Sequence, residues 1–340
     1  MSPKLSEIGE FGLIRRIADG CKKVPEGIEG IGDDCAVIPM NDDFDMLVAV
    51  DSIQEGIDFD FRWSSPPDVG RKALSINLSD IAAMGGIPKY FLVSIALPSD
   101  LDLNFVNEIY SGIDSLASEE GLLMIGGDTS SSKNGVSISV TIMGEVKKGK
   151  AILRKGACAG DSIFISGPVG LSALGLAALK MNLSEGMKRF VGRHLSPIHR
   201  TSLGRALLES GCVTSMIDVS DGLFADLEHI ADSSGVGFEI DINRIPVCEG
   251  FAEAAAVVGM DWRGLVLSGG EDFELVFTVD SGKVAQFLPL AERLGVTEIG
   301  HILKDREVRS VIHAQDLMVR GIGSGYDHFS SAKARMKEPG

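Results

Sequence analysis

Residues 73–86 read Ala-Leu-Ser-Ile-Asn-Leu-Ser-Asp-Ile-Ala-Ala-Met-Gly-Gly, and Asp80 is the only charged residue between Ala73 and Met84. The apolar residues of this stretch recur with helical spacing, which predicts a helix that is buried on two sides. One face includes Asp80 and consists of Val69, Ala73, Ile76, Asp80 and Ala83. The other face is wholly apolar and consists of Leu74, Leu78 and Ile81.

Asp80 is the residue that such a helix accommodates least easily. A carboxylate on an apolar face costs roughly several kcal/mol unless a cation, a metal or hydrogen-bond donors compensate for it. Two interpretations are open: Asp80 is a buried ligand, or it caps a new helix that begins at Ile81. Asn77 lies one helical turn before Asp80 and can reach the same place.

The composition is that of a globular protein long enough for two domains, with 340 residues of which 44% are apolar and 24% charged. A net charge of −16 argues against a nucleic-acid backbone or an anionic membrane as partner, and it is compatible with a site that collects divalent cations. Five cysteines without a C-x-x-C spacing indicate a reducing compartment rather than a disulfide framework or a zinc site. No apolar run approaches the ~20 residues of a membrane span and no signal-peptide pattern is visible, so we expect a cytoplasmic protein.

Strand and helix patterns alternate along the chain, which predicts an α/β (α+β) protein. We expect an N-terminal domain over residues 1–150, a C-terminal α/β domain over residues 151–330 and a tail over residues 331–340. The predicted strands cover residues 45–50, 91–97, 122–125, 136–142, 161–166, 215–219, 237–242 and 273–279. The predicted helices include one that begins at Pro66-Pro67 and others over residues 101–120, 171–180, 201–210 and 221–233.

Aspartates recur where an apolar segment meets a glycine-rich turn. Each one alone is more simply a turn former or a helix cap. Several together, at segment ends that share one edge of a sheet, predict a ligand site. Oxygen ligands without His or Cys suit Mg²⁺, which commonly completes its shell with substrate phosphates. The candidates are Asp34, Asp51, Asp80, Asp128, Asp218 and Asp221.

The common nucleotide-binding and nucleophile motifs are absent from the sequence. The run Gly144-Glu-Val-Lys-Lys-Gly149-Lys150-Ala151 departs from the P-loop pattern, because Ala stands where Ser or Thr is required. No Rossmann fingerprint follows a strand, and no G-x-S-x-G or H-E-x-x-H occurs. If the chain binds ATP, it does so without a P-loop.

Several segments in order and spacing resemble the thiamine-monophosphate kinase family. They are Gly32-Asp-Asp-Cys-Ala36, Val50-Asp-Ser52, Asn77-Leu-Ser-Asp-Ile-Ala-Ala-Met-Gly85, Ile125-Gly-Gly-Asp-Thr129, Ile217-Asp-Val-Ser-Asp-Gly222, Leu267-Ser-Gly-Gly-Glu-Asp-Phe-Glu-Leu275 and Gly325-Tyr-Asp-His-Phe329. The resemblance covers about residues 9–329. It implies an aminoimidazole ribonucleotide synthetase-like (PurM-like) fold, in which an N-terminal sheet domain forms a barrel with a second subunit. It also implies a homodimer and Mg²⁺- and ATP-dependent phosphorylation of thiamine monophosphate to the diphosphate.

The resemblance also implies roles for individual residues. Metal positions fall on Asp34, Asp51, Asp80, Asp128, Asp218 and Asp221; ATP-contacting positions fall on Tyr110, Gly127, Asp128, Arg154 and Ser220. Asp34, Asp80, Asp128, Asp218 and Arg154 are the implied catalytic set. Glu271 falls on a substrate position, and Asp58 and Gly323 align with two further substrate-side positions.

Three positions depart from the family pattern. Asp58 stands where His is common, Gly323 where an aromatic residue often stacks on the substrate, and Val50 where Thr is frequent. Trp262 and Tyr326 are candidates to replace the missing ring. The departures leave open a related ATP-dependent phosphotransferase or synthetase that acts on another small phosphorylated or amide substrate. A third interpretation, from a different class, is a binding protein for nucleotide or metal that has lost turnover.

Overall fold

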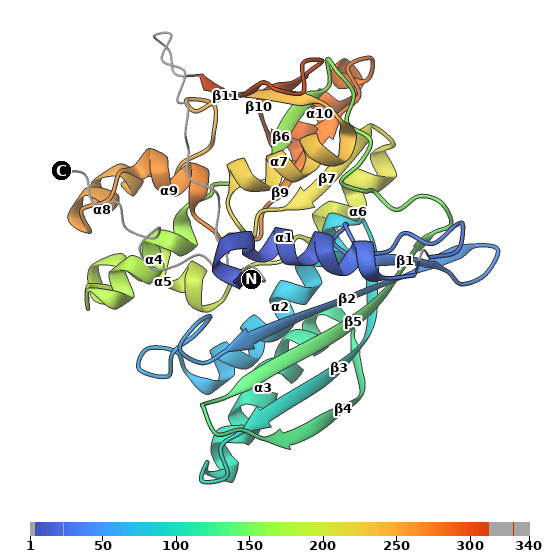
Figure 1. Ribbon diagram of the computed structural model, residues 1–340. Coiled ribbons are helices and arrows are strands. Elements are labelled where there is room, and N and C mark those ends of the chain that lie inside the picture. Colours follow the sequence, from blue (N-terminus) through green and yellow to red (C-terminus); the bar gives the residue numbers. More distant parts are fainter. Residues whose placement is uncertain (1–3, 23, 313–328, 330–340) are drawn as a thin grey trace.

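The structure is a computed structural model, and it describes residues 4–22, 24–312 and 329. Its N-terminal half is built on a five-stranded sheet of order β1-β2-β5-β3-β4 (Figure 1). Strand β3 is parallel to β4, and the other pairs are antiparallel. The strands are β1 (Ala36–Pro39), β2 (Phe44–Gln54), β3 (Ile87–Leu97), β4 (Leu123–Ser131) and β5 (Ser137–Lys147), and the helices are α1 (Leu5–Gly20), α2 (Pro66–Ala83) and α3 (Leu103–Glu120).

Helix α2 confirms the helix predicted around residues 73–86. Ser65 is its N-cap and accepts a hydrogen bond from the Asp68 N–H, and Pro66 opens the first turn. The helix continues through Asp80 to Ala83, so the interpretation of Asp80 as the cap of a new helix is wrong. Both predicted faces are buried.

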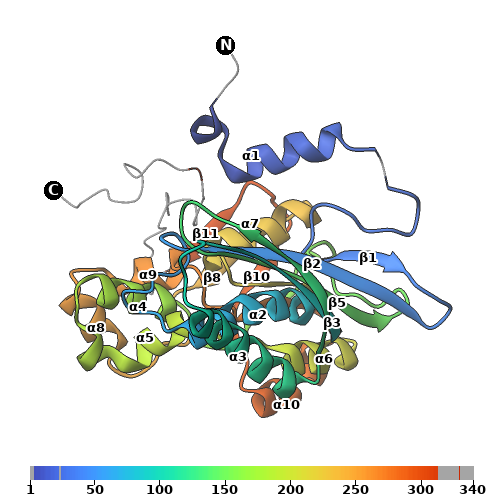
Figure 2. The ribbon, with the colours of Figure 1, turned by 90° about the horizontal axis from the view of Figure 1, so that it is seen from below.

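Helices α2 and α3 cover one face of this sheet, while α1 lies on the other side of it (Figure 2). Close packing of α2 on α3 requires glycine, because a Cβ on Gly70 would lie 1.9 Å from the Ile109 carbonyl oxygen. Helix α1 buries none of its own residues on the sheet face away from α2, and this face remains largely open, with Val50 on it 62% exposed. This half therefore buries one side of its sheet and leaves the other uncovered.

The C-terminal half is built on a six-stranded sheet of order β11-β8-β10-β6-β9-β7, which occupies the opposite half of the molecule (Figure 1). Helix α2 also contacts β7, α5 and α6 of this half, so it lies between the two sheets. The strands are β6 (Ser162–Ile165), β7 (Val213–Asp218), β8 (Gly237–Asp241), β9 (Leu275–Val279), β10 (Thr297–Leu303) and β11 (Arg309–Ile312). The helices are α4 (Leu171–Lys180), η1 (Ser184–Met187), α5 (Lys188–Leu195), α6 (Thr201–Ser210), α7 (Leu223–Ser234), α8 (Phe251–Val257), α9 (Trp262–Ser268) and α10 (Val284–Leu294).

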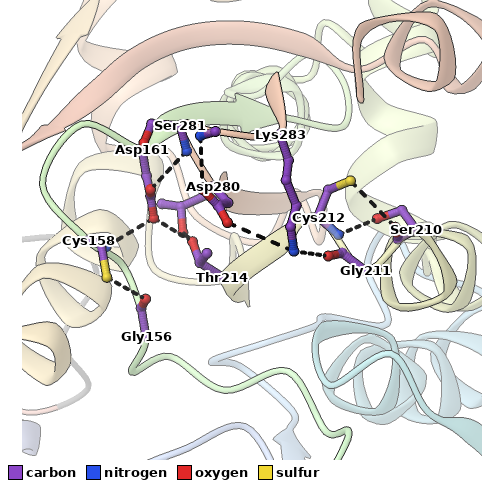
Figure 3. A network of polar contacts seen from close by, with 12 residues as sticks. Gly156, Cys158, Asp161, Ser210, Gly211, Cys212, Thr214, Asp280, Ser281 and Lys283 are labelled. Carbon is purple, nitrogen blue, oxygen red and sulfur yellow. Dashed lines mark hydrogen bonds and ion pairs between the residues drawn. The ribbon is translucent and has the colours of Figure 1, made fainter. Parts of the chain in front are cut away.

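A polar network joins several segments at the end of this second sheet where β7 begins (Figure 3). Asp218 lies at the other end of β7. The buried carboxylate of Asp161 accepts hydrogen bonds from the Cys158 and Ser281 N–H groups and from the Thr214 hydroxyl. Its donors belong to three different segments. Asp161 therefore holds these three segments together. All five cysteines of the chain, including Cys158, are free thiols.

The mixed helix and sheet architecture confirms the predicted fold class, but some local predictions were wrong. Asp51 and Asp128 do not stand at strand ends, because β2 and β4 both continue past them. Strands β1, β10 and β11 and helices α5, α8, α9 and α10 were not predicted. The glycine-rich segment ending in Phe329 lies almost wholly outside the described residues. No helix in the described part of the chain has the length and apolarity to span a membrane.

Candidate metal and phosphate site

Three of the predicted aspartates meet between the two halves of the molecule. Asp34 comes from the loop before β1, Asp80 from the last turn of α2, and Asp218 from the end of β7. One carboxylate oxygen from each lies within 4.8 Å of the others. We call these three residues the carboxylate group. Because its members come from both halves, the fold must be complete before the group exists.

Burial and mutual repulsion both disfavour the ionised forms of the carboxylate group. Burial raises the pKa of Asp80 well above its usual value, and the neighbouring charges of Asp51, Asp218 and Asp34 raise it further. Burial, then repulsion from Asp34, raises the pKa of Asp218 to about 8. The Asp34 Oδ2 atom is buried and has no hydrogen-bond partner. Three clustered carboxylates with an orphaned oxygen therefore fit a bound cation.

Arg154 supplies a positive charge at one side of the carboxylate group. Its guanidinium donates to Asp34 Oδ1 through two nitrogens, and its backbone N–H donates to Asp33 Oδ2 at 3.1 Å. The Arg154 side chain is 21% exposed, so most of it is buried at the site. Burial and the repulsion of Asp34 still raise the pKa of Asp33 to about 7. One arginine thus leaves the site with excess negative charge.

Hydrogen bonds from α2 orient the surrounding polar groups. The Ser79 hydroxyl donates to Asp218 Oδ2 at 2.6 Å, which opposes the rise in the pKa of Asp218. Asn77 Oδ1 accepts the backbone N–H of Asp51 at 3.0 Å, so Asn77 does reach toward the same site as Asp80. These bonds hold the Asp218 side chain and the Asp51 backbone against α2.

Asp128 and Gly127 are not brought to the carboxylate group. Asp51 pairs with Val140, which pairs with Val93, which pairs with Gly127, so β2 and β4 are three strand spacings apart. Neighbouring strands are about 4.8 Å apart, so Asp51 on β2 lies roughly 14 Å, measured across the strands, from β4, which carries Asp128. Asp128 also pairs with exposed Ser94, which places it on the open face, opposite α2.

Tyr110 lies on α3 and lines a hollow of about 600 Å³ together with Met124 of β4. Burial raises the pKa of its hydroxyl. The three implied ATP-contacting or metal residues therefore lie near the β4 edge of the sheet, Tyr110 on the face that α3 covers and Asp128 on the open face, with Gly127 between Gly126 and Asp128 in β4.

Asp221 belongs to a second group that sequence reasoning only partly found. It lies with Asp226 and His229 of α7, and one ligand atom from each is within 4.8 Å of the others. Burial and repulsion from Asp221 raise the pKa of Asp226 well above its usual value. Burial lowers the pKa of His229 to about 4, and its Nε2 atom has no hydrogen-bond partner. The spacing of three residues between Asp226 and His229, on one helix face, was the available signal.

Glu271 lies in the loop after α9, where Lys72 and His194 contact its carboxylate. Sequence reasoning missed Lys72, which follows Arg71 just before the apolar stretch that begins at Ala73 and so resembles an ordinary exposed lysine. The substrate-side candidate Asp58 uses Oδ2 to accept the Gln54 N–H at 2.7 Å. Ser220 lies beside Glu271 and accepts its N–H at 2.7 Å. Gly323 and Tyr326 lie outside the described residues, and Trp262 begins α9 and packs partly against the C-terminal core.

Two family models match the two halves of the chain. The model of the AIR synthase related protein N-terminal domain matches residues 32–146, and that of the C-terminal domain matches residues 159–313. The fold and its aspartates at the junction thus define an AIR synthase related protein.

Relatives identify the branch within this class. The thiamine-monophosphate kinase of Bacillus subtilis (strain 168) is 36% identical over 94% of this chain and 99% of its own, and that of Escherichia coli O157:H7 is 35% identical over 95% and 99%. A solved structure described as AaThiL complexed with AMPPCP and TMP superposes with a TM-score of 0.83, at 32% identity over 96% of this chain and 99% of that chain. The chain belongs to the thiamine-monophosphate kinase family.

Proposed function

We propose that the protein phosphorylates thiamine monophosphate to thiamine diphosphate, with ATP as donor and Mg²⁺ as cofactor, by direct in-line transfer. The observation that carries the proposal is the carboxylate group of Asp34, Asp80 and Asp218, whose oxygens lie within 4.8 Å of one another. Membership of the family and the similarity to the complex with AMPPCP and TMP support the same reaction.

The donor set supports Mg²⁺ as the cation. Asp34, Asp80 and Asp218 offer only oxygen ligands, and the buried Asp34 Oδ2 has no other partner. Such hard ligands prefer Mg²⁺, and carboxylates with substrate phosphates commonly complete its shell. We assign Asp51, which adjoins Asp80, to the same set, and we assign Asp221 to a further cation with Asp226. Bound Mg²⁺ would neutralise phosphate charge during transfer.

The residues of the chain place the reactants rather than remove a proton. A phosphate acceptor is already ionised at neutral pH, so no strong general base is needed. Arg154 holds Asp34 in position and offers a cation beside the phosphates. Ser220 lies between the carboxylate group and Glu271, at a place suited to contact ATP. Glu271 lies at the substrate end, with Asp58 in the neighbouring turn.

We propose further that the protein is a homodimer. The open sheet face bears exposed Val50, and β4 exposes Leu123 and Ile125, an apolar surface that a second copy can bury. The same surface carries Asp128, which lies too far from the carboxylate group of its own chain. A dimer through this face lets Asp128 and the neighbouring Gly127 backbone act at the site of the second copy, while Tyr110 lies on α3 at the covered face. Val50→Glu should therefore give monomers by sedimentation and lose activity; an active monomer would contradict the dimer.

The division into domains is also a proposal. Strand β5 ends at Lys147 and β6 begins at Ser162, which supports a boundary near Lys150. Free thiols at all five cysteines support a reducing, cytoplasmic location.

A coupled assay of ADP release tests the function directly. The protein is supplied with ATP, Mg²⁺ and thiamine monophosphate, and thiamine diphosphate is identified by chromatography. We expect ADP and thiamine diphosphate in equal amounts, and no turnover when a chelator removes the metal. ADP release with a different phosphate ester, but none with thiamine monophosphate, would replace the proposed acceptor.

A further inference from the structure

Lys72 is buried where a charged helix residue normally faces solvent. The residue is 2% exposed on α2. Its Nζ donates to the Asp58 carbonyl oxygen at 2.8 Å and lies 2.7 Å from Glu271 Oε1. A buried ammonium persists only with such partners, so these contacts account for its burial. Lys72 therefore connects the turn after β2 with the loop after α9.

The second oxygen of Glu271 is held as well. Oε2 lies 3.3 Å from His194 Nδ1, which is also 3.1 Å from the Ser172 hydroxyl. Burial and then the charge of Lys72 lower the pKa of His194, so the imidazole is neutral at pH 7. An ionised Glu271 can only accept, which places the imidazole proton on Nδ1. Both carboxylate oxygens have a partner, while the side chain keeps 32% of its surface exposed.

The backbone of Glu271 is fixed in an unusual conformation. Its φ angle is +63°, in the left-handed region that non-glycine residues rarely occupy. Its N–H donates to the Ser220 carbonyl oxygen at 2.7 Å, and the Phe273 N–H donates to that of Val219 at 2.9 Å. Conformations of this kind persist where surrounding contacts enforce them, and they gather at ligand sites. The loop is thus held rigidly against the segment that follows Asp218.

One face of α2 makes three contacts with the C-terminal half. Lys72 pairs with Glu271, the Ser75 hydroxyl donates to the Pro197 carbonyl oxygen, and the Ser79 hydroxyl donates to Asp218. The spacings of three and four residues place these side chains in one row. Seven residues of helix span about 10 Å. Helix α2 therefore sets the distance between the carboxylate group and Glu271.

We propose that Lys72 is a positioning residue that holds Glu271 at this distance and so selects the length of the phosphate acceptor. The inference rests on the proposed function, in which the acceptor phosphate lies at the carboxylate group. The ligand that fits has a cationic or amino-bearing ring system about 10 Å from its phosphate. Glu271, already balanced by Lys72, then acts as an oriented hydrogen-bond acceptor for that ring system.

The test compares Lys72→Met with a matched control. Lys283 likewise contacts one carboxylate, that of Asp280, and one backbone carbonyl, that of Gly211, but it is 46% exposed in the network of Figure 3. We expect Lys72→Met to raise the KM for thiamine monophosphate about tenfold, with kcat and the KM for ATP within about twofold. Lys283→Met should change none of these. An equal rise in both KM values, or no rise for the acceptor, would overturn the proposal.

A double-mutant cycle gives the second readout. Glu271→Gln should raise the same KM, and the Lys72→Met/Glu271→Gln protein should resemble the single variants because the two residues act together. Additive effects would overturn the proposal. If thermal unfolding shows that Lys72→Met does not fold, Lys72→Arg replaces it. This variant keeps the charge, and an acceptor KM within about threefold of wild type is expected; a loss as large as that of Glu271→Gln contradicts the role.

The two proposals fail in different ways. A wild-type protein that turns over another acceptor, or none, contradicts the proposed function. Calorimetric titration of thiamine monophosphate into wild type and Lys72→Met then still compares binding without turnover. Equal affinities of the two proteins would overturn the role of Lys72, whatever the reaction is.

Discussion

Helix α2 contacts two carboxylates of the C-terminal half, Glu271 through Lys72 and Asp218 through Ser79, which lies seven residues further along the helix. The pKa values of these two carboxylates shift in opposite directions. Burial and the neighbouring Asp34 raise the pKa of Asp218 to about 8. Burial also raises the pKa of Glu271, but Lys72 and His194 outweigh it and lower the pKa to about 2. Asp218 is 3% exposed and the Glu271 side chain 32% exposed, but the opposite directions of their pKa shifts follow from the charge of their neighbours.

This difference separates two uses of a buried carboxylate. Glu271 has its cation within the protein, so its charge is present and its position is fixed. The carboxylate group has three acidic members and, among the described residues, hydrogen bonds to the single cation Arg154. The negative charge of the carboxylate group is balanced only when a cation from solution binds. A carboxylate whose pKa is raised by neighbouring carboxylates is therefore suited to bind a metal ion. A carboxylate whose pKa is lowered by a nearby lysine already has its counter-ion within the protein.

The largest expected effect follows from Asp80→Asn, which removes the middle carboxylate. Turnover should fall roughly a thousandfold because charge at the phosphates is no longer balanced. The metal-free protein should become more stable, since a neutral amide removes the repulsion between Asp80 and the neighbouring aspartates. A coupled ADP assay and thermal unfolding in chelator measure the two effects. Asp42→Asn, at an exposed turn, is the control; an Asp80→Asn enzyme with near wild-type turnover would contradict the metal assignment.

Asp218 predicts how the stability of the metal-free protein depends on pH. Between about pH 4 and 8 this carboxyl is ionised in the unfolded chain and protonated in the folded one, so stability falls as pH rises. Asp218→Asn should reduce this fall by a few kcal/mol at roughly 1.4 kcal/mol per pKa unit, while Asp80 and Asp33, whose pKa values are also raised, keep the remainder. Unfolding by urea in chelator from pH 4 to 8 measures it. Added Mg²⁺ should restore the wild type at pH 8 and leave Asp218→Asn less changed; the reverse pattern would be inconsistent with the comparison.

Ser79→Ala tests the bond that orients Asp218 and should have a smaller effect. Without the hydroxyl, the Mg²⁺ concentration for half-maximal activity should rise about tenfold, as is usual when a partner of a metal ligand is removed. Ser75→Ala is the control, because Ser75 lies on the same helix face but donates to the Pro197 carbonyl oxygen. Equal shifts for both variants would mean that the helix, rather than the bond to Asp218, is responsible.

Glu271 should show the opposite pH behaviour, with the smallest effect. Its pKa is lowered, so its contribution to stability is present above about pH 4.5 and is lost as pH falls toward 2. Glu271→Gln should therefore lower stability near pH 6 by about 1 kcal/mol. The two proteins should become equally stable near pH 2. Urea unfolding across this range measures the difference, and a gap that persists at the acid end would show that the charge of Glu271 is not its cause.

The sequence predicted those features that depend on neighbours along the chain. Helix α2 was predictable because Leu74, Leu78 and Ile81 recur with helical spacing, and Pro66 marks its start. The extension of β4 through Asp128 was not, because Gly126 and Gly127 resemble a turn while the pairing with β3 keeps them extended. Tertiary pairing overrode the local preference.

Contacts between distant segments account for the remaining differences. The aspartates of the carboxylate group were found as a set, since each stands in a recognisable local pattern. The pairing of Lys72 with Glu271 has no local pattern, because it forms only when α2 packs against the loop after α9. The separation of Asp128 from Asp80 likewise follows from strand order, which residue spacing does not encode.

The most direct test of the account is the position of a bound metal in crystals grown with Mn²⁺ and a non-hydrolysable ATP analogue. Mn²⁺ takes the place of Mg²⁺ among oxygen ligands and gives an anomalous signal. We expect an anomalous peak within about 2.3 Å of carboxylate oxygens of Asp34, Asp80 and Asp218. Anomalous peaks elsewhere on the analogue, with none at these three residues, would contradict it.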